Sequence, residues 1–327
     1  MKNIVIGTTF IDIKGFPESD FAANGRNAGD ISYVHGGVGR NIAENLARCG
    51  QNPLFISGVD DSPFAGAILH RLAGEGVDTQ FMIRNDHALG SWLAVFDSEG
   101  DVAASISKRP ELSEIADLLD RKAEEIFADA DSISVEIDMD PVILDKVHEH
   151  ADRRGIPVFA VVSNMKIAIE QEALHRHIHC LVCNLQEAGL IVESMRKAEA
   201  DLSNLSPQEL LAVLKETMAQ LPIDNVIVTM GGDGAVYLSK MTGEEGWIPA
   251  APAEVCDTTG AGDAFFSGVV MGLTRRLARQ GSRRSGARAG SRLNRQASLE
   301  EACQIGALLA SKVIATRENV CPRMGGI

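Results

Sequence analysis

Short apolar runs alternate with segments of helical spacing along most of the chain. Residues 2–7 form an apolar run that ends in glycine, and similar runs recur between segments whose apolar positions repeat every three or four residues. Strands that alternate with helices indicate a parallel sheet covered by helices on both faces. The later predicted strands are 54–59, 132–136, 158–162, 180–183 and 226–230, and the predicted helices are 41–49, 63–74, 113–127, 141–154, 165–176 and 207–220, with two more beginning at 262 and 299.

Two segments interrupt this rhythm. Residues about 10–35 are broken by glycine, proline and asparagine, and residues about 90–108 have the pattern of a β-hairpin around the turn 98–101. Both are predicted to form a flap beside the main sheet. A length of 327 residues is compatible with one large α/β domain or with two. We predict a single domain over residues 1–327 with this small appendage.

The stretch 275–297 differs in composition from the rest of the chain. It carries eight arginines among glycine, serine and alanine, with almost no apolar period. This composition predicts a flexible loop. A tether for RNA or phosphate is one interpretation of the arginines, but most charge-dense insertions are simply solvated.

Composition narrows the class of partner. The formal net charge of −14 works against general binding to nucleic acid or to an anionic membrane, since both repel an acidic surface. No apolar run approaches the roughly 20 residues that span a bilayer, and residues 1–7 lack the features of a secretory signal. We expect a cytoplasmic protein that binds a small molecule.

Two of the six cysteines have the spacing of a metal site. Cys180 and Cys183 lie close to His177 and His179, and these four side chains are all potential zinc ligands. The surrounding apolar residues instead favour a buried strand in which cysteine is a small apolar filler. We favour the strand over the zinc site.

The strongest local motif is Asp257-Thr-Thr-Gly-Ala-Gly-Asp263, which precedes a helical pattern. A turn of small residues that opens a helix directs several backbone N–H groups and the positive end of the helix dipole at one point, where a phosphate can bind. A carboxylate at this point would repel the phosphate unless it accepts the proton of an attacking hydroxyl. The alternative is that Asp263 only caps the helix.

A second glycine turn, Gly36-Gly-Val-Gly-Arg-Asn41, also precedes a helix. It matches the dinucleotide fingerprint weakly because the third glycine is absent, so a dehydrogenase is disfavoured. In a sugar site, Asn41 offers both a donor and an acceptor to hydroxyl groups. Asp12, shortly after the first strand, offers further acceptors, although a single aspartate is often only a turn residue.

Two more polar clusters directly follow predicted strands, where parallel sheets bind ligands. Thr229-Met-Gly-Gly-Asp-Gly234 suits a nucleotide that passes close to the backbone, or a plain hairpin turn. Asn184-Leu-Gln-Glu187 either organises water around Mg²⁺ or forms a helix cap.

Together, the four clusters resemble the PfkB carbohydrate kinases, also called ribokinase-like, over almost the whole chain. Residues 36–50 and 257–270 match the two signature regions of that family. The resemblance implies a ribokinase-like α/β fold with a small β lid, formed by the two flap segments, and a reaction that uses ATP and Mg²⁺. It also makes a homodimer through the lid an option.

The resemblance implies a role for each motif residue. Asp263 matches the catalytic base, and the anion hole for the phosphoryl group matches Gly260, Ala261 and Gly262. The sugar-binding positions are Asp12, Gly37 and Asn41. The nucleotide-binding positions are Asn184, Glu187, Thr229, Gly231 and Gly234, with Glu187 supporting Mg²⁺ through water.

The resemblance is incomplete at one place. Many relatives bind K⁺, and the matching positions here are Asp257 and Thr259. The nearby C-terminal stretch Glu318-Asn-Val-Cys-Pro322 departs from the usual sequence, so K⁺ dependence stays open.

Within the family, residues 36–48 are most similar to the pseudouridine kinases, chiefly through Arg40, Glu44 and Asn45. The expected reaction is therefore phosphorylation of the primary 5′-hydroxyl of a ribosyl compound, with pseudouridine as the first candidate. Another sugar or nucleoside kinase of the ribokinase, fructokinase or adenosine kinase type is the alternative. A non-catalytic sensor of nucleotide or sugar is the second alternative, which the intact Asp263 disfavours.

Overall fold

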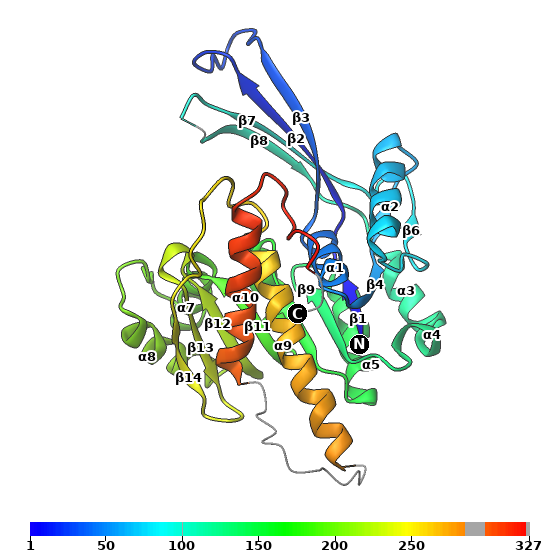
Figure 1. The fold of residues 1–327 in the computed structure, drawn as a ribbon, viewed down its shortest axis with the longest axis vertical. Coiled ribbons are helices and arrows are strands. Elements are labelled where there is room, and N and C mark those ends of the chain that lie inside the picture. Colours follow the sequence, from blue (N-terminus) through cyan, green and yellow to red (C-terminus); the bar gives the residue numbers. More distant parts are fainter. Residues whose placement is uncertain (100, 285–297, 325–327) are drawn as a thin grey trace.

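The structure is a computed structural model that describes residues 1–99, 101–284 and 298–324. In this part of the chain, eight strands form a main sheet in the order β14-β13-β12-β11-β10-β9-β1-β4 (Figure 1). The strands from β12 to β4 are parallel, and β13 and β14 add an antiparallel edge. The strands are β1 Lys2–Ile6, β4 Asn52–Ile56, β9 Ser132–Glu136, β10 Val158–Val161, β11 Ile178–Asn184, β12 Ile223–Thr229, β13 Ala235–Ser239 and β14 Glu245–Ile248.

Helices cover both faces of the main sheet. One hydrophobic core contains the buried side of α1 Val38–Arg48, α2 Pro63–Glu75, α9 Ala261–Arg284 and α10 Leu299–Ile314. The other core, on the opposite face, contains the buried sides of six helices: α3 Glu114–Arg121, α4 Ala123–Phe127, α5 Pro141–Arg154, α6 Met165–Glu170, α7 Leu185–Arg196 and α8 Pro207–Met218.

Successive side chains along each strand point to opposite faces of the main sheet, so an apolar strand contributes to both cores. Val5 packs in the first of these cores, whereas its neighbours Ile4 and Ile6 pack in the second. A strand buried on both faces requires a continuous apolar run, which is the pattern in the sequence. The predicted α/β fold with a mostly parallel sheet is confirmed.

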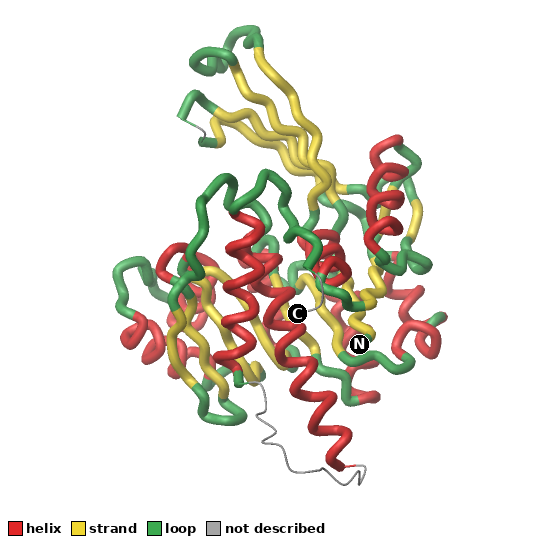
Figure 2. The backbone as a smooth tube through the Cα atoms, viewed as in Figure 1, coloured by secondary structure: helices red, strands yellow, loops and turns green. Residues whose placement is uncertain are grey.

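A second sheet projects from one end of this body (Figures 1 and 2). Its order is β3-β2-β7-β8, with β2 and β7 parallel and the outer pairs antiparallel. The two flap segments of the sequence thus pair with each other, which brings residues near 10 and 90 side by side. The strands are β2 Phe10–Pro17, β3 Gly29–Gly36, β7 Gly90–Phe96 and β8 Val102–Lys108, and a separate pair is formed by β5 Gly58–Val59 and β6 Ile83–Arg84.

Several predicted boundaries were wrong. The strand predicted over 54–59 ends at Ile56 as β4, and residues 58–59 form β5 in the separate pair with β6. The helix predicted over 113–127 is divided into α3 and α4 at Lys122. The helix predicted over 165–176 ends at Glu170, because Glu172 has a left-handed backbone with φ of 54°, and a 3₁₀ turn, η1 Ala173–His175, follows. The predicted loop 275–297 is helical over its first ten residues, since α9 continues to Arg284, and residues 285–297 lie outside the described part of the chain.

The zinc interpretation is incompatible with the strand geometry. Cys180 packs in the core on one face of the main sheet and Cys183 in the core on the other. Their thiols therefore point away from each other and cannot share a metal ion. Among the described residues, no group of three or more His, Cys, Asp or Glu is arranged to bind a metal ion. None of the described helices is long and apolar enough to cross a membrane.

Candidate active site

Polar residues, some of them predicted from the sequence and some not, gather at the carboxyl edge of the main sheet. Thr8 and Asp138 follow β1 and β9, and Asn184 and Thr229 end β11 and β12. The N-termini of α1 and α9 meet this edge, because the Nδ2 of Asn41 donates a hydrogen bond to Asp263 Oδ2 at 2.6 Å. Residues more than 200 positions apart in the sequence thus form one site, at the place where parallel sheets bind ligands.

Asp263 lies half-buried in the first turn of α9. Burial raises its pKa to about 7, and Glu187 adds to that rise, whereas the Asn41 hydrogen bond and Arg40 oppose it. A carboxyl group with a pKa near 7 accepts and releases a proton readily at neutral pH, which is the property of a general base.

The turn before α9 is shaped by Gly260. Its φ of 81° is in the left-handed region, and a β-carbon would collide with the backbone of Asn319. The N–H of Ala261 donates to the carbonyl of Thr258 at 3.2 Å, so this amide already has a partner within the turn. Gly262, at the next position, is exposed. Of the three predicted anion-hole residues, Gly262 is thus the exposed one, whereas Gly260 and Ala261 are half-buried.

The start of α1 depends on a second glycine. Gly37 has a φ of 97°, and a β-carbon there would collide with the carbonyl of Thr8. The carboxylate of Glu136 accepts hydrogen bonds from the backbone N–H of Thr8 at 2.6 Å and of Gly39 at 2.7 Å. Burial, with a contribution from Asp138, raises the pKa of Glu136 to about 8.

Sequence reasoning missed Glu136. The only signal was its position as the polar last residue of the apolar run 132–136. A single acidic residue at a strand end is too common to identify a site, whereas its two backbone partners come from segments about 100 positions away.

Asp12 lies on β2, where the second sheet approaches the glycine turn. Its carboxylate packs against Gly36, where a β-carbon would collide with it. Burial raises the pKa of Asp12, and Lys14 and Arg40 partly oppose that rise. The three predicted sugar-binding residues, Asp12, Gly37 and Asn41, therefore surround one turn.

A cavity of about 500 Å³ lies beside Thr8, whose carbonyl accepts a hydrogen bond from the N–H of Arg40 in this turn, and Ile167 of α6 also lines it. Its lining includes Thr8, Arg109, Asp138 and Gln171. Asp138 is buried and accepts hydrogen bonds from Ser163 N–H and Oγ at 3.1 and 2.7 Å. Thr8 also bonds Glu136, so it links the cavity to the start of α1.

Asn184 and Glu187 form a capping box at the start of α7. Each side chain accepts the backbone N–H of the other residue at 2.8 Å. The helix-cap interpretation of this motif is therefore correct for its geometry. Glu187 is also more than a capping residue in its electrostatics, because burial and the nearby Asp138 raise its pKa.

The turn 229–234 follows β12 as predicted. It contains a short 3₁₀ helix, η2 Gly231–Asp233, and Thr229 Oγ1 donates to the carbonyl of Cys183 at 3.4 Å. A cavity of about 380 Å³ lies beside it, lined in part by Met230, Gly232, Asp233 and Trp247. The turn thus forms one wall of a second ligand-sized space, although Thr229, Gly231 and Gly234 are not part of the lining.

Asp257 and Thr259 lie in the turn before α9. Burial would raise the pKa of Asp257, but hydrogen bonds from Thr259, including one from its N–H at 2.8 Å, lower the pKa overall. The backbone N–H groups of Cys256 and Asp257 donate to the carbonyl of Ile314 at the end of α10. The turn is thereby anchored to the segment that leads to Glu318 and Asn319.

A carboxyl group in the first turn of a helix, at the carboxyl edge of a parallel sheet, is the arrangement expected of an enzyme that transfers a phosphoryl group to a hydroxyl. The family model described as "pfkB family carbohydrate kinase" matches residues 1–320. The chain belongs to this family and is a sugar or nucleoside kinase.

The relatives include several acceptor specificities. The guanosine-inosine kinase of Exiguobacterium acetylicum is 30% identical over 319 residues, which cover 97% of this chain and 96% of that protein. The pseudouridine kinase of Escherichia coli (strain K12) is 28% identical over 269 residues, which cover 81% of this chain and 82% of that protein.

Solved structures share the fold. The ribokinase of Arabidopsis thaliana, solved with ribose and ATP, aligns with a TM-score of 0.75 at 18% identity and covers 98% of this chain and 96% of its own. The ribokinase of Cryptococcus neoformans, solved with ADP, aligns with a TM-score of 0.72 at 17% identity, and the alignment covers 98% of this chain and 97% of that chain. The predicted family and the ribokinase-like fold are confirmed.

Proposed function

We propose that the protein phosphorylates the primary 5′-hydroxyl of a ribonucleoside with ATP as donor. The observation that carries this proposal is the pairing of Asp263 with Asn41, which joins the glycine turn of the acceptor side to the helix N-terminus of the phosphate side. Asp263 removes the proton of the hydroxyl as the phosphoryl group moves. Gly260, Ala261 and Gly262 provide the anion hole, and positioning and charge stabilisation supply most of the acceleration.

The cavity beside Thr8 favours a nucleoside over a free sugar. The residues proposed to bind the sugar, Asp12, Gly37 and Asn41, surround a turn that packs against Thr8, and Thr8 lines the cavity. A space of about 500 Å³ is far larger than a ribose ring needs, and its lining includes Arg109, whose Nη2 pairs with the buried Asp138 and whose other N–H groups can serve a ligand. A nucleobase, with polar groups around a flat ring, fits such a space.

Two classes of nucleoside are candidates for the acceptor whose base enters this cavity. Guanine or hypoxanthine is favoured because the guanosine-inosine kinase matches over nearly the full length of both chains. Pseudouridine, the candidate from the motif around Arg40, is the second, supported by a relative of similar identity but shorter coverage.

The nucleotide and its metal occupy the other side of Asp263. We assign ATP to the turn with Thr229, Gly231 and Gly234 and to the neighbouring cavity of about 380 Å³. Glu187, whose raised pKa reflects burial near Asp138, is an oxygen donor suited to holding Mg²⁺ through water. Mg²⁺ would neutralise charge on the phosphates. Asp257, kept ionised by Thr259, suits K⁺ in the adjoining turn.

The second sheet serves as a lid over the acceptor and as a dimer surface. The end of this sheet nearest the main body lies at the glycine turn, because Phe10 on β2 pairs with Gly36 and Asp12 packs against Gly36. Its strands expose apolar side chains, among them Ile106 at 70% and Ile31 at 65%. A second copy of the chain is the partner that we propose for this surface. Light scattering should give twice the monomer mass, and Ile106→Asp should return the monomer.

The function is tested by incubating the protein with Mg-ATP and, in separate tubes, guanosine, inosine, pseudouridine, adenosine, ribose and fructose. ADP release and the product mass are measured. We expect the fastest turnover with guanosine or inosine. Turnover of ribose or fructose alone would reject the nucleoside proposal, and no turnover in any tube would favour the non-catalytic sensor.

A further inference from the structure

Arg40, next to Asn41 on α1, is a charged side chain with no exposed surface. It is among the largest fully buried side chains of the described residues. Burying an unpaired charge is costly, so such a residue persists only where several partners surround it. The assignment of base, anion hole and sugar-binding residues leaves this arginine without a role.

The guanidinium of Arg40 joins three separate segments of the chain. It donates to Glu44 Oε2 at 2.6 Å within α1 and to the carbonyl of Gly36 at 3.3 Å. Its Nη2 donates to the carbonyl of His35 and to Oδ1 of Asn41. The same Nη2 lies 3.1 Å from Oδ1 of Asn319, in the C-terminal segment.

The contact with Asn41 fixes the orientation of its amide. An arginine has only donors, so the oxygen of the Asn41 amide must face Arg40. The amide nitrogen is then left facing Asp263, whose carboxylate accepts its hydrogen bond at 2.6 Å. Without Arg40, a rotated amide would direct its oxygen at the carboxylate and repel it.

The contact with Asn319 supports the other side of the site. The side chain of Asn319 is held between Arg40 and the carbonyl of His35, to which its Nδ2 donates at 2.8 Å. The backbone of Asn319 packs against Gly260 so closely that no β-carbon fits there. Arg40 therefore contacts the residues that support both the base and the turn before α9.

We propose that Arg40 is a positioning residue for phosphoryl transfer: it orients the Asn41 amide toward Asp263 and holds Asn319 behind Gly260. The inference rests on the proposed role of Asp263 as the base. It does not depend on which acceptor is the substrate, because Arg40 acts on the carboxylate and the anion hole.

The charges around Asp263 give the proposal a pH signature. Arg40 on α1 lowers the pKa of Asp263, together with the hydrogen bond from Asn41, whereas burial and Glu187 on α7 raise it. Loss of the guanidinium removes both the positive charge and the ordered hydrogen bond. The pKa of Asp263 should then rise, so the pH below which turnover falls should move upward.

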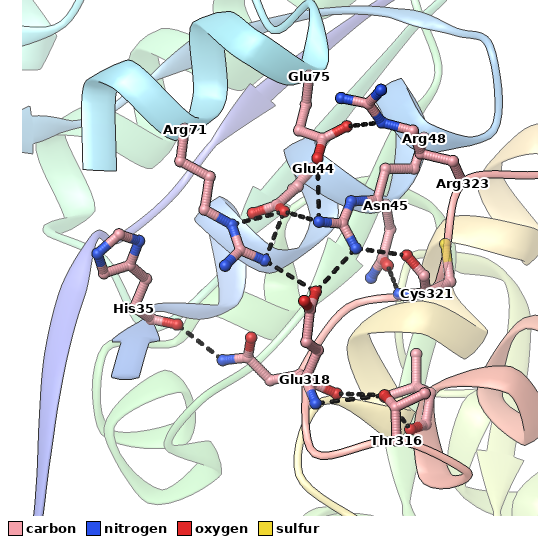
Figure 3. A network of polar contacts seen from close by, with 12 residues as sticks. His35, Glu44, Asn45, Arg48, Arg71, Glu75, Thr316, Glu318, Cys321 and Arg323 are labelled. Carbon is pink, nitrogen blue, oxygen red and sulfur yellow. Dashed lines mark hydrogen bonds and ion pairs between the residues drawn. The ribbon is translucent and has the colours of Figure 1, made fainter. Parts of the chain in front are cut away.

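The structure indicates that Arg40 can be replaced without leaving an unpaired charge. Glu44 keeps ion pairs with Arg48 at 2.9 Å and with Arg71 at 2.8 Å (Figure 3). Arg40→Met conserves the volume of the side chain and removes the charge. Arg40→Lys keeps the charge but lacks the planar fork that reaches several acceptors at once.

The experiment compares both variants with wild type, using whichever acceptor the wild type turns over fastest. For Arg40→Met we expect kcat to fall about 10-fold, as for loss of one charge-assisted hydrogen bond, and the acidic limb of kcat/KM to move to higher pH. For Arg40→Lys we expect the acidic limb of kcat/KM to stay near its wild-type pH, whereas kcat should fall. The matched control is Arg71→Met, which removes another partner of Glu44 but has no contact with Asn41. It should lower Tm and leave the acidic limb in place.

Two results would overturn the proposal. If Arg40→Met lowers Tm but keeps the wild-type acidic limb and kcat, Arg40 is only a structural residue, and the function of the enzyme is unaffected. If Asp263→Asn, measured beside it, keeps full turnover, the base assignment fails and the role of Arg40 fails with it. Should Arg40→Met not fold, the kcat of Arg40→Lys decides, because a wild-type kcat in that variant would overturn the proposal.

Discussion

The two halves of the active site are built in different ways. On the proposed acceptor side, ionisable groups are buried or half-buried and their partners are distant in sequence: Asn41 bonds Asp263, and Glu136 holds the N–H groups of Thr8 and Gly39. On the nucleotide side, Asn184 and Glu187 bond each other three residues apart, and the turn 229–234 is closed by a bond from Met230 N–H to the carbonyl of Gly234.

This difference indicates that the two sides contribute differently to the reaction. Buried, long-range polar contacts fix a single geometry, because any displaced partner leaves an unsatisfied group in a low-dielectric interior. Local caps and turns depend only on a few consecutive residues, so they tolerate changes in neighbouring segments. We infer that the acceptor side controls chemistry and specificity, and that the nucleotide side presents backbone to a ligand shared by many kinases.

The largest effect is expected at the centre of the acceptor side. Asp263→Asn removes the proposed base but keeps the shape of the side chain and a hydrogen-bond acceptor for Asn41. We predict that kcat falls by ~10²-fold or more, whereas ATP binding changes little. Steady-state kinetics and ATP titration calorimetry measure the two quantities. Wild-type turnover in this variant would remove Asp263 from the mechanism.

Glu136 provides a second test of the acceptor side. Glu136→Ala leaves the N–H groups of Thr8 and Gly39 without an acceptor, so we predict a loss of stability of about 1–3 kcal/mol and a rise of about 10-fold in KM for the acceptor. Glu136→Gln keeps an acceptor oxygen and should have a smaller effect on both. Equal effects of the two variants, or a change confined to KM for ATP, would contradict the role of Glu136.

The nucleotide side should respond less. Asn184→Ala removes the N-cap of α7, which we expect to lower stability by about 1 kcal/mol and to raise KM for ATP a few-fold. The matched control is Ser206→Ala, because Ser206 and Glu209 form the same capping box on α8. The control should lower stability equally without changing KM for ATP. If Asn184→Ala behaves like the control, the capping box is structural only.

The smallest predicted effect concerns stability and pH. Asp263 and Glu136 have folded-state pKa values of about 7 and about 8, above their ordinary values, so the folded protein binds more protons than the unfolded chain across this range. Their contribution to stability is present at low pH and is lost as pH rises through these values. Asp263→Asn should therefore raise Tm relative to wild type by about 2–4 °C at pH 8 and less at pH 5. Parallel Tm curves would exclude a raised pKa at Asp263.

Sequence reasoning succeeded where one short segment contains the whole signal. The runs of β1, β9 and β11 predict a parallel sheet because each strand must be apolar on both faces. The motif around Asp263 predicts a glycine turn that opens a helix, and the structure contains this turn at Gly260 and the helix α9, because the two are adjacent in the chain. The capping box of Asn184 and Glu187 is also visible in four residues.

It failed where the property depends on distant segments. Arg40 was noted as a mark of a subgroup, but its burial depends on Asn319, 279 positions away. Glu136 is one of many acidic residues until the fold brings Thr8 and Gly39 to it. The cavity beside Thr8 is lined by residues from several separate segments, so no single stretch of sequence indicates its size.

The central claim is that the phosphoryl group is transferred to a primary hydroxyl beside Asp263. Phosphorus NMR of the product made from the best nucleoside tests it directly, because a phosphate on the 5′ carbon couples to the pair of protons on that carbon. We predict a phosphorus signal split by two equivalent couplings, and its absence when the 5′-deoxy nucleoside is supplied. A signal coupled to a single ribose proton, from a phosphate on a secondary hydroxyl, would contradict the proposed geometry.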